Sequence, residues 1–331
     1  MRVLVAVPGN LRTVPMSRFV PDALAALGHE VRTVDYSRSF LEKLKSRAAP
    51  ARAVEKRVLR AIEDAAPELF LTLYGANISA GVLAHLRERG ITTANWWLND
   101  PFQFERAMSI LPAYDFAFTN ARGSLAAYAA RGMRNVHFLP TACEPGVHRP
   151  LPPRPPVCDV SFAGDWSAAR EQLAGWLVGA GVDLRIFGPW RRKLARSSPL
   201  RPRLEHGFFT PQRMAEIFAA CRATLNVHTW RGKFDYGLNP RVFEAAACGV
   251  PQLVDWKREL DELFDEKERS AMLIYRSDEE LLQLCRRQDL DELRAKAVAA
   301  SAAIREKHSY LARMRELLRV CSEPRRRESA P

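Results

Sequence analysis

The stretch YGLNPRVFEAAACGVP, residues 236–251, predicts a short helix with well-defined ends. Asn239 is a favoured N-cap residue, Pro240 suits the first helical position, and Gly249 suits the residue that follows the last turn. The run QLVD at residues 252–255 then predicts a short strand. This stretch therefore indicates one helix–strand unit of an α/β fold.

The same alternation of strands and helices continues in both directions along the chain. Strand runs separated by helix-period segments indicate βαβ units and mostly parallel sheets. The two halves also open alike, with VAVPG at residues 5–9 and VSFAG at residues 160–164. We therefore predict two Rossmann-like domains that face each other across a cleft. Strands are expected at residues 3–7, 31–36, 69–73, 92–97, 116–119, 136–139, 158–163, 184–187, 223–228, 252–255 and 273–275.

Seven prolines between residues 140 and 156 separate the two halves, because such a run fits neither a helix interior nor a central strand. The predicted boundaries are an N-terminal domain over 1–145, a proline-rich linker over 146–156 and a C-terminal domain over 157–308. A final helical segment is expected over 309–320, and the arginine-rich tail over 321–331 is expected to be disordered.

Composition limits the class of protein. The 331 residues carry a formal net charge of +12, which favours anionic partners, although a compositional bias towards arginine would produce the same value. The six cysteines lack metal-binding spacing, so we expect reduced thiols in a cytoplasmic protein. The apolar run at residues 3–7 is too short for a signal peptide, and we expect no membrane span.

The helix start within 236–251 is the best candidate for binding chemistry. Unpaired N–H groups and the helix dipole make it suited to a diphosphate, and Gly237 allows a ligand to approach the backbone closely. Arg241 in the first turn would face the same anion. Glu244, expected to face solvent, could accept hydrogen bonds from the two hydroxyls of a ribose. The alternative is a capped surface helix with a solvated glutamate and arginine.

Several ordered motifs resemble GT-B glycosyltransferases, most closely the CgeB-like (spore-maturation-type) branch of the family 1/4-like group. The residues that carry this resemblance are Asn239, Arg241, Phe243 and Glu244, followed by ACG at 247–249. The segments that agree in order are NDP at 99–101, DVSFAG at 159–164, IFGPW at 186–190, YRSDEEL at 275–281 and HSY at 308–310. The resemblance covers nearly the whole chain.

The resemblance implies the GT-B fold, with a C-terminal helix that crosses back to the N-terminal domain. It also implies transfer of a hexose from a nucleotide-sugar donor, UDP-linked in our prediction, that is held by the C-terminal domain. Glu244 matches the ribose-binding glutamate, and Arg241 would face the diphosphate. The remaining donor-binding candidates are Asn239, Gly237, Tyr236, Gly164, Arg170, Gly188, Gly207 and His228.

Tyr236 stands where many related enzymes have a second glutamate that contacts the donor sugar. This difference motivates the alternative hypothesis of a catalytically inactive nucleotide-sugar-binding protein. On the acceptor side, Asp100 could act as a catalytic base at a strand end, or form a simple Asp-Pro turn. Gly9 and Asn10 follow the first strand and would lie near the acceptor, or form a tight turn. His228 could bind donor phosphate or be structural.

Two basic segments point to partners beyond the donor. Residues 185–203 hold seven basic side chains and no acidic one, and residues 45–60 hold six against one. These runs are either solvated surface or contacts for an anionic acceptor, a lipid-linked acceptor or the inner face of a membrane. We expect no nucleic acid, because no recognised module is present. We also expect no required metal and no cofactor, since the DLD at 289–291 lies in a helical stretch.

Overall fold

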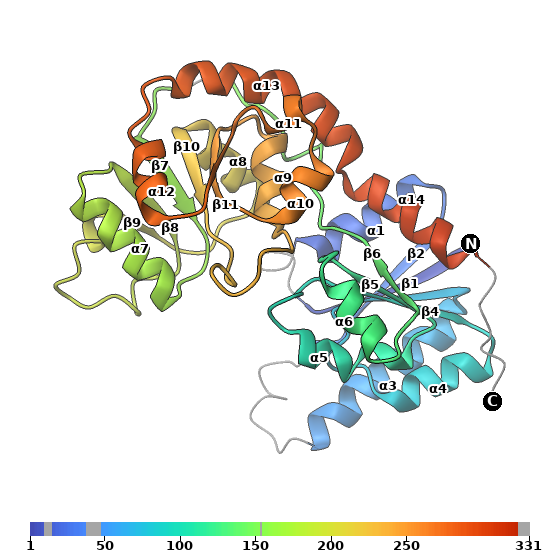
Figure 1. Ribbon diagram of the computed structural model, residues 1–331. Helices are drawn as coiled ribbons and strands as arrows, with labels where there is room; N and C mark the ends of the chain where they lie inside the picture. The colour runs from blue at the N-terminus through green and yellow to red at the C-terminus, as the bar shows by residue number, and fades with distance from the viewer. Residues whose placement is uncertain (10–14, 38–47, 153, 324–331) are drawn as a thin grey trace. The chain divides into compact units, whose positions relative to one another are not determined.

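The computed structural model describes residues 1–9, 15–37, 48–152 and 154–323, in which two parallel sheets of six strands each are covered by helices (Figure 1). All of the strand pairs in the two sheets are parallel. The α/β prediction is therefore confirmed. Asn10, part of the basic segment 45–60 and residues 324–331 of the predicted tail lie outside the described residues.

The first compact unit comprises residues 1–140 and 310–331. Its sheet has the order β2-β1-β3-β4-β5-β6, so β1 lies between the second and third strands of the chain. Its elements are β1 (Arg2–Val7), α1 (Met16–Ala26), β2 (Glu30–Asp35), α3 (Ala48–Ala65), β3 (Leu69–Leu73), α4 (Ala80–Glu88), β4 (Thr92–Trp97), α5 (Phe104–Met108), η1 (Leu111–Ala113), β5 (Phe116–Thr119), α6 (Ser124–Ala130), β6 (Val136–Phe138) and α14 (Tyr310–Cys321).

The second compact unit comprises residues 141–309. Its sheet has the order β12-β11-β10-β7-β8-β9, so β7 lies between β10 and β8. Its elements are β7 (Cys158–Ala163), α7 (Ala168–Gly179), β8 (Leu184–Gly188), η2 (Arg201–Arg203), β9 (Leu204–His206), α8 (Pro211–Ala219), β10 (Cys221–Asn226), α9 (Pro240–Ala247), β11 (Gln252–Asp255), α10 (Arg258–Leu263), α11 (Glu266–Arg269), β12 (Met272–Tyr275), α12 (Asp278–Cys285) and α13 (Leu290–Lys307).

The central strands of both sheets are apolar because helices cover both of their faces. All five residues of β3 are buried, and so are the last five residues of β1. In the second unit, Val160, Leu184, Ile186 and Leu253 are completely buried in one cluster. This rigid arrangement fixes the carboxyl ends of the strands, which is where open α/β sheets bind ligands.

The last helix returns to the first unit. α14 packs against α1, beside which it lies in Figure 1. The Tyr310 ring packs at an angle against Phe19 and edge-on against Trp96, with centroid distances of 5.5 and 6.2 Å. Arg313 Nε donates a hydrogen bond of 3.1 Å to the carbonyl oxygen of Pro140. The chain therefore enters the second unit near residue 140 and leaves it near residue 309.

Several local details differ from the sequence predictions. The strand expected to end at His228 ends at Asn226, two residues earlier. The short edge strand β9 was not expected, because its three residues lack an apolar pattern. The helical segment expected to end at residue 320 includes Cys321. Within the described part of the chain, no helix combines the length and apolar character needed to cross a membrane.

Candidate functional site

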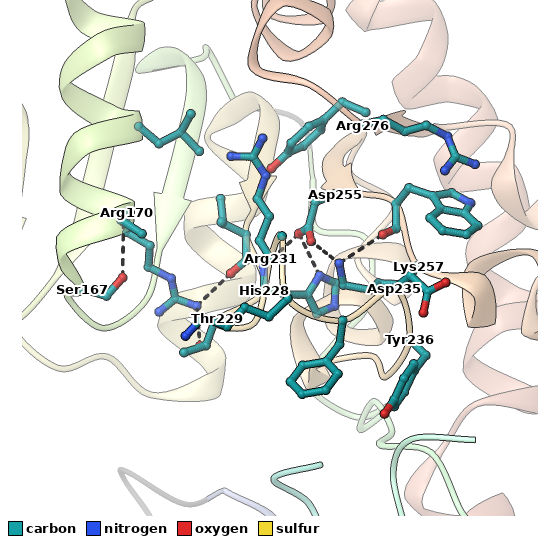
Figure 2. Close-up of a pocket in the computed structure, with 18 residues that line it drawn as sticks. Ser167, Arg170, His228, Thr229, Arg231, Asp235, Tyr236, Asp255, Lys257 and Arg276 are labelled. Atoms are coloured by element: carbon teal, nitrogen blue, oxygen red, sulfur yellow. Dashed lines mark hydrogen bonds and ion pairs between the residues drawn. The ribbon is translucent and has the colours of Figure 1, made fainter. Parts of the chain in front are cut away.

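A cavity of about 640 Å³ opens at the carboxyl edge of the second sheet (Figure 2). Its walls come from the segments that follow β7, β10, β11 and β12. The chain order reverses between β7 and β10, and this switch point is the usual ligand crevice of an open α/β sheet. The lining residues are Ser167, Ala169, Arg170, Leu173, Val227, His228, Thr229, Arg231, Gly232, Lys233, Phe234, Asp235, Tyr236, Asp255, Trp256, Lys257, Tyr275 and Arg276.

A buried ion cluster around Asp255 forms the floor of this cavity. Asp255 Oδ1 lies 2.8 Å from Nδ1 of His228 and also accepts a 2.8 Å hydrogen bond from the backbone N–H of His228. Asp255 Oδ2 accepts a 2.6 Å bond from Nζ of Lys257, and Figure 2 shows both connections. Burial by itself would raise the pKa of Asp255, but the charges of His228 and Lys257 hold that pKa well below its usual range.

The contact with Asp255 orients the His228 ring. A carboxylate only accepts hydrogen bonds, so Nδ1 of His228 carries the proton and Nε2 remains for another group. Nε2 is buried and has no hydrogen-bond partner among the described residues. His228 therefore lines the cavity with one buried ring nitrogen that makes no hydrogen bond to the described residues.

Arginine and lysine side chains give the cavity a positive character. Five cationic residues and two carboxylates are among its lining residues. Arg170 is fixed by its Nη2, which donates to the Val227 carbonyl oxygen at 2.8 Å and to Thr229 Oγ1 at 3.3 Å. Burial lowers the pKa of Arg170, as does the nearby charge of Arg241. Arg276 is exposed and lies over the Trp256 ring at 3.8 Å. This cavity is suited to an anion.

The predicted helix start is present, but its side chains are engaged with each other. Asn239 has the extended backbone of an N-cap residue, yet its side chain makes no capping bond. Instead, the amides of Asn239 and Asn226 exchange two hydrogen bonds of 3.1 and 2.8 Å. Arg241 lies within 6.0 Å of the ring centres of Phe209 and Phe218 and near the Met214 sulfur. The N-cap residue of α9 is thus anchored to the last residue of β10.

Glu244 is buried, whereas the sequence analysis expected it to face solvent. Its Oε2 accepts a 2.6 Å hydrogen bond from Arg241, and its Oε1 lies 4.0 Å from Nε2 of His148. Burial alone would raise the pKa of Glu244, but Arg241 and His148 lower it overall. Neither Arg241 nor Glu244 lines the cavity, although Arg241 is close enough to Arg170 to affect its pKa.

The predicted glycines have different surroundings. A Cβ added at Gly188 would lie 2.2 Å from the Gly164 carbonyl oxygen, so this glycine permits the close approach of two strand ends. The N–H of Gly237 donates to Glu259 at 2.8 Å and is not available to a ligand. Gly207 has a positive φ of 144° and open space around it. Tyr236 lines the cavity beside Asp235.

In the first unit, Asp100 is fully buried. Its Oδ2 accepts hydrogen bonds from Thr119 Oγ1 at 2.6 Å and from the Tyr128 hydroxyl at 2.7 Å. Burial raises the pKa of Asp100. This environment favours the structural alternative over catalysis, although its neighbour Asn99 lines a cavity of this unit. Gly9 has a positive φ of 104° at the end of β1.

Sequence reasoning missed Asp255, Lys257, Arg231 and Arg276, all of which line the main cavity. A signal for two of these residues was present. Asp255 ends one predicted strand, and Arg276 directly follows another. Carboxyl ends of neighbouring parallel strands converge at one edge, and this rule, which points to Asp100 and His228, points equally to Asp255 and Arg276. Among the described residues, no three His, Cys, Asp or Glu side chains cluster as metal ligands.

The comparisons with known proteins agree with this architecture. Residues 167–319 match the family described as "Glycosyl transferase-like". A sucrose-phosphate synthase from Thermosynechococcus elongatus is similar in structure, with a TM-score of 0.70 at 13% identity, covering 96% of this chain and 98% of that one. HepE from Anabaena, in complex with UDP and glucose, gives a TM-score of 0.65 at 13% identity, covering 98% and 100%.

A glycosyltransferase from Rickettsia africae gives a TM-score of 0.65 at 12% identity, covering 97% of this chain and 98% of that one. No curated protein matches the chain. Such low identities bear on the fold alone. The chain therefore has the fold of the GT-B glycosyltransferases, and its residues 167–319 fit a glycosyl transferase-like family.

Proposed function

We propose that this protein is a glycosyltransferase that moves a hexose from a UDP-linked donor to an acceptor hydroxyl without a metal ion. Within the GT-B enzymes we assign it to the CgeB-like branch, on the motifs that it shares with that branch. The single observation that carries the proposal is the cationic cavity at the carboxyl edge of the second sheet. Its place at the switch point and its excess of basic residues both suit a nucleoside diphosphate.

In this proposal, the donor diphosphate contacts Arg170 and His228. Negative charge builds up on the diphosphate as the bond to the sugar breaks, so fixed cations stabilise the transition state more than the ground state. Asp255 fixes the His228 ring at the cavity, and Lys257 offsets the charge of Asp255. No metal is needed for this stabilisation, because the side chains supply the positive charge.

The remaining donor residues keep the roles that the resemblance implies. Glu244 would accept hydrogen bonds from the ribose hydroxyls, which requires it to share or exchange its present bond with Arg241. Arg241 and the start of α9 would then face the diphosphate. Gly164, Gly188 and Gly207 would border the phosphates and the base. On the acceptor side, Gly9, Asn10 and Asp100 remain predictions.

Thermal unfolding of the full chain with UDP, ADP, GDP and UDP-glucose tests the donor assignment. A ligand that binds only the folded state raises the melting temperature in proportion to ln(1 + [L]/Kd). We expect UDP and UDP-glucose to raise it more than ADP or GDP. Arg170→Gln should weaken UDP binding about tenfold or more, the scale for losing a charged hydrogen bond. Lys296→Gln, on the exposed side of α13, is the control.

Two outcomes contradict parts of this proposal. If UDP has no effect on the unfolding temperature, the donor assignment is wrong. If UDP-glucose binds but is neither hydrolysed nor used for transfer, the protein is the inactive nucleotide-sugar binder that Tyr236 suggests. Thermal unfolding separates these two outcomes, and a release assay for UDP, run with a panel of glycan acceptors, separates the inactive binder from an active transferase.

We further propose an anionic or lipid-linked acceptor at the cytoplasmic face of a membrane. The support is the loop after β8, where Arg191, Arg192 and Lys193 are exposed. Attraction to acidic lipid is worth about 1 kcal/mol per basic residue and weakens with salt. We expect binding to anionic but not neutral vesicles, reduced in high salt and by changing these three residues to serine. If neither anionic nor neutral vesicles retain the protein at low salt, the proposed membrane contact is wrong.

A further inference from the structure

A second cavity, of about 390 Å³, lies at the carboxyl edge of the first sheet. The segments that follow β1, β2, β3 and β4 form its walls. The order of strands along the chain reverses at β1, which makes this edge the switch point of the first sheet. Its volume falls within the usual range of small-molecule sites, about 300–1,000 Å³. The lining residues are Pro8, Tyr36, Ser37, Tyr74, Ala76, Asn77, Trp97, Asn99, Gln103 and Arg106.

A strained turn presents one aromatic wall of this cavity. Tyr74 has a φ of +64°, which side chains other than glycine seldom adopt, and Gly75 follows with a φ of +78°. A Cβ at Gly75 would lie 2.5 Å from Asn95 Nδ2, so glycine is required there. Tyr74 packs edge-on against Trp97, with ring centroids 6.2 Å apart.

Buried hydrogen bonds hold this turn in place. The Tyr36 hydroxyl donates to the Leu73 carbonyl oxygen and accepts from the Gly75 N–H at 3.0 Å. Asn95 Nδ2 donates to the Tyr74 carbonyl oxygen at 3.2 Å. Strained backbone that is fixed from several sides in this way is typical of ligand sites. The network therefore fixes the position of Tyr74, which lines the cavity and also packs against the buried cluster that contains Trp97.

The polar part of the wall is neutral except for one cation. Asn99 Nδ2 donates to Gln103 Oε1 at 3.2 Å, which leaves the Asn99 oxygen and the Gln103 nitrogen for other partners. Arg106 is exposed and forms no ion pair with a carboxylate of the described residues. No lining residue carries a carboxylate. The cavity therefore combines one partly exposed aromatic ring, side-chain amides and one positive charge with no carboxylate in the lining.

We propose that this cavity binds a pyranose that bears a phosphate or carboxylate group, and that this sugar is the acceptor. The partly buried Tyr74 ring would contact the apolar face of the sugar, while Asn99 and Gln103 bond its hydroxyls. Arg106 would hold the anionic group through paired N–H donors. The acceptor role rests on the function proposed above, whereas binding of the sugar does not.

Calorimetric titration of the 331-residue chain with four probes tests this site. The probes are glucose 6-phosphate, glucuronate, glucose and inorganic phosphate, each added with and without saturating UDP. We expect both anionic sugars to bind at least about tenfold more tightly than glucose, because one charged hydrogen-bonded contact is worth about that factor. Inorganic phosphate should bind more weakly than glucose 6-phosphate, since it lacks the ring. UDP should leave these affinities unchanged.

Two variants and a control assign the binding to this cavity. Arg106→Gln should weaken both anionic sugars about tenfold and leave glucose unchanged. Arg89 is an exposed arginine of the same unit, and Arg89→Gln should change neither the affinity for the anionic sugars nor that for glucose. Tyr74→Gly removes the ring, and glycine adopts the positive φ without strain. This variant should therefore fold but bind none of the sugar probes. Its melting temperature is measured in parallel.

The inference is overturned if neither anionic sugar binds, if glucose binds equally well, or if Arg106→Gln has no effect. If inorganic phosphate binds as tightly as glucose 6-phosphate, the cavity does not recognise the sugar ring, and that part of the inference is wrong. A protein that binds UDP but no sugar contradicts this inference alone. A protein that binds the sugars but not UDP contradicts only the proposed donor.

Discussion

At the scale of single residues, Asp255 determines how His228 and Lys257 are placed at the cavity of the second unit. Its carboxylate is almost completely buried and bonds to both His228 and Lys257. A buried carboxylate without these cations would be protonated or strongly destabilising. Asp255 therefore fixes the position of one ring and one ammonium group at the cavity.

We expect Asp255→Ala to lower the free energy of unfolding by about 3–5 kcal/mol, because it leaves two buried cationic or polar groups uncompensated. Asp183→Ala breaks a half-exposed pair with Arg203 and should cost at most about 1 kcal/mol. Urea unfolding of both variants measures the difference. Equal effects would show that burial of the Asp255 cluster adds no stability.

The same cluster predicts the direction of a pH effect. The pKa of Asp255 is lowered in the folded protein, so its contribution to stability is present above the unfolded value of about 3.9 and is lost as the pH falls below it. The difference in unfolding free energy between the natural chain and Asp255→Ala should therefore narrow between about pH 4 and pH 2. A constant difference over this range would contradict the assignment.

Glu244→Gln separates the two roles of the second buried carboxylate. The change keeps the shape of the side chain but removes the charge partner of Arg241. We expect it to weaken UDP binding by about 1–3 kcal/mol and to lower stability by a similar amount. Glu292→Gln, exposed on α13, is the control. Unchanged UDP affinity would remove Glu244 from the donor site.

At the scale of elements, the loops after neighbouring strands must fit closely against one another. Gly188 at the end of β8 meets the backbone of Gly164, which follows β7. The Trp190 indole also donates a 2.9 Å hydrogen bond to the Gly164 carbonyl oxygen. The position of the loop that leads to Arg170 therefore depends on a glycine on the adjacent strand.

We expect Gly188→Ala to destabilise the protein by about 1–3 kcal/mol, because its Cβ would be forced against the Gly164 carbonyl oxygen. The displaced loop should also weaken UDP binding. Gly175→Ala is the matched control, since that glycine lies inside α7 with open space around it. Alanine there should stabilise by about 0.5–1 kcal/mol. Thermal unfolding and UDP titration compare the two variants. If both have the same stability and UDP affinity, Gly188 is not closely packed against Gly164.

At the scale of the whole molecule, the chain divides into two units that are each built around their own sheet. α14 follows the second unit in the sequence but belongs to the first, where Met314 and Leu317 are completely buried. A change in α14 should therefore affect the stability of the first unit and leave the UDP-binding unit unaltered.

Met314→Ala tests this division. We expect a loss of about 2–5 kcal/mol in the unfolding of the first unit, the usual cost of such a cavity. UDP affinity should not change. Arg315→Ala, an exposed position of the same helix, should be within about 0.5 kcal/mol of the natural chain. Loss of UDP affinity in Met314→Ala would show that α14 also supports the donor site.

The sequence by itself determined the α/β fold and most of its elements. The runs predicted as strands at 69–73 and 252–255 have those same bounds in the structure, and every residue in them is buried because helices cover both faces of the sheet. The helix at 236–251 begins at Pro240, as its cap residues predict, because N-cap and first-turn preferences act over a few neighbouring residues. Such local signals can be recognised in the sequence without knowledge of the tertiary structure.

Only the tertiary structure decided which side chains are buried and which meet. Nothing local marks Glu244 as buried, since its partner His148 is 96 positions away and is brought there by the path of the chain. Asp255 and His228 come together because β10 and β11 are adjacent in the sheet, and strand order is a property of the whole fold. Exposure, pKa and cavities depend on these distant contacts, so the sequence predicted the elements and the tertiary packing determined the chemistry of the sites.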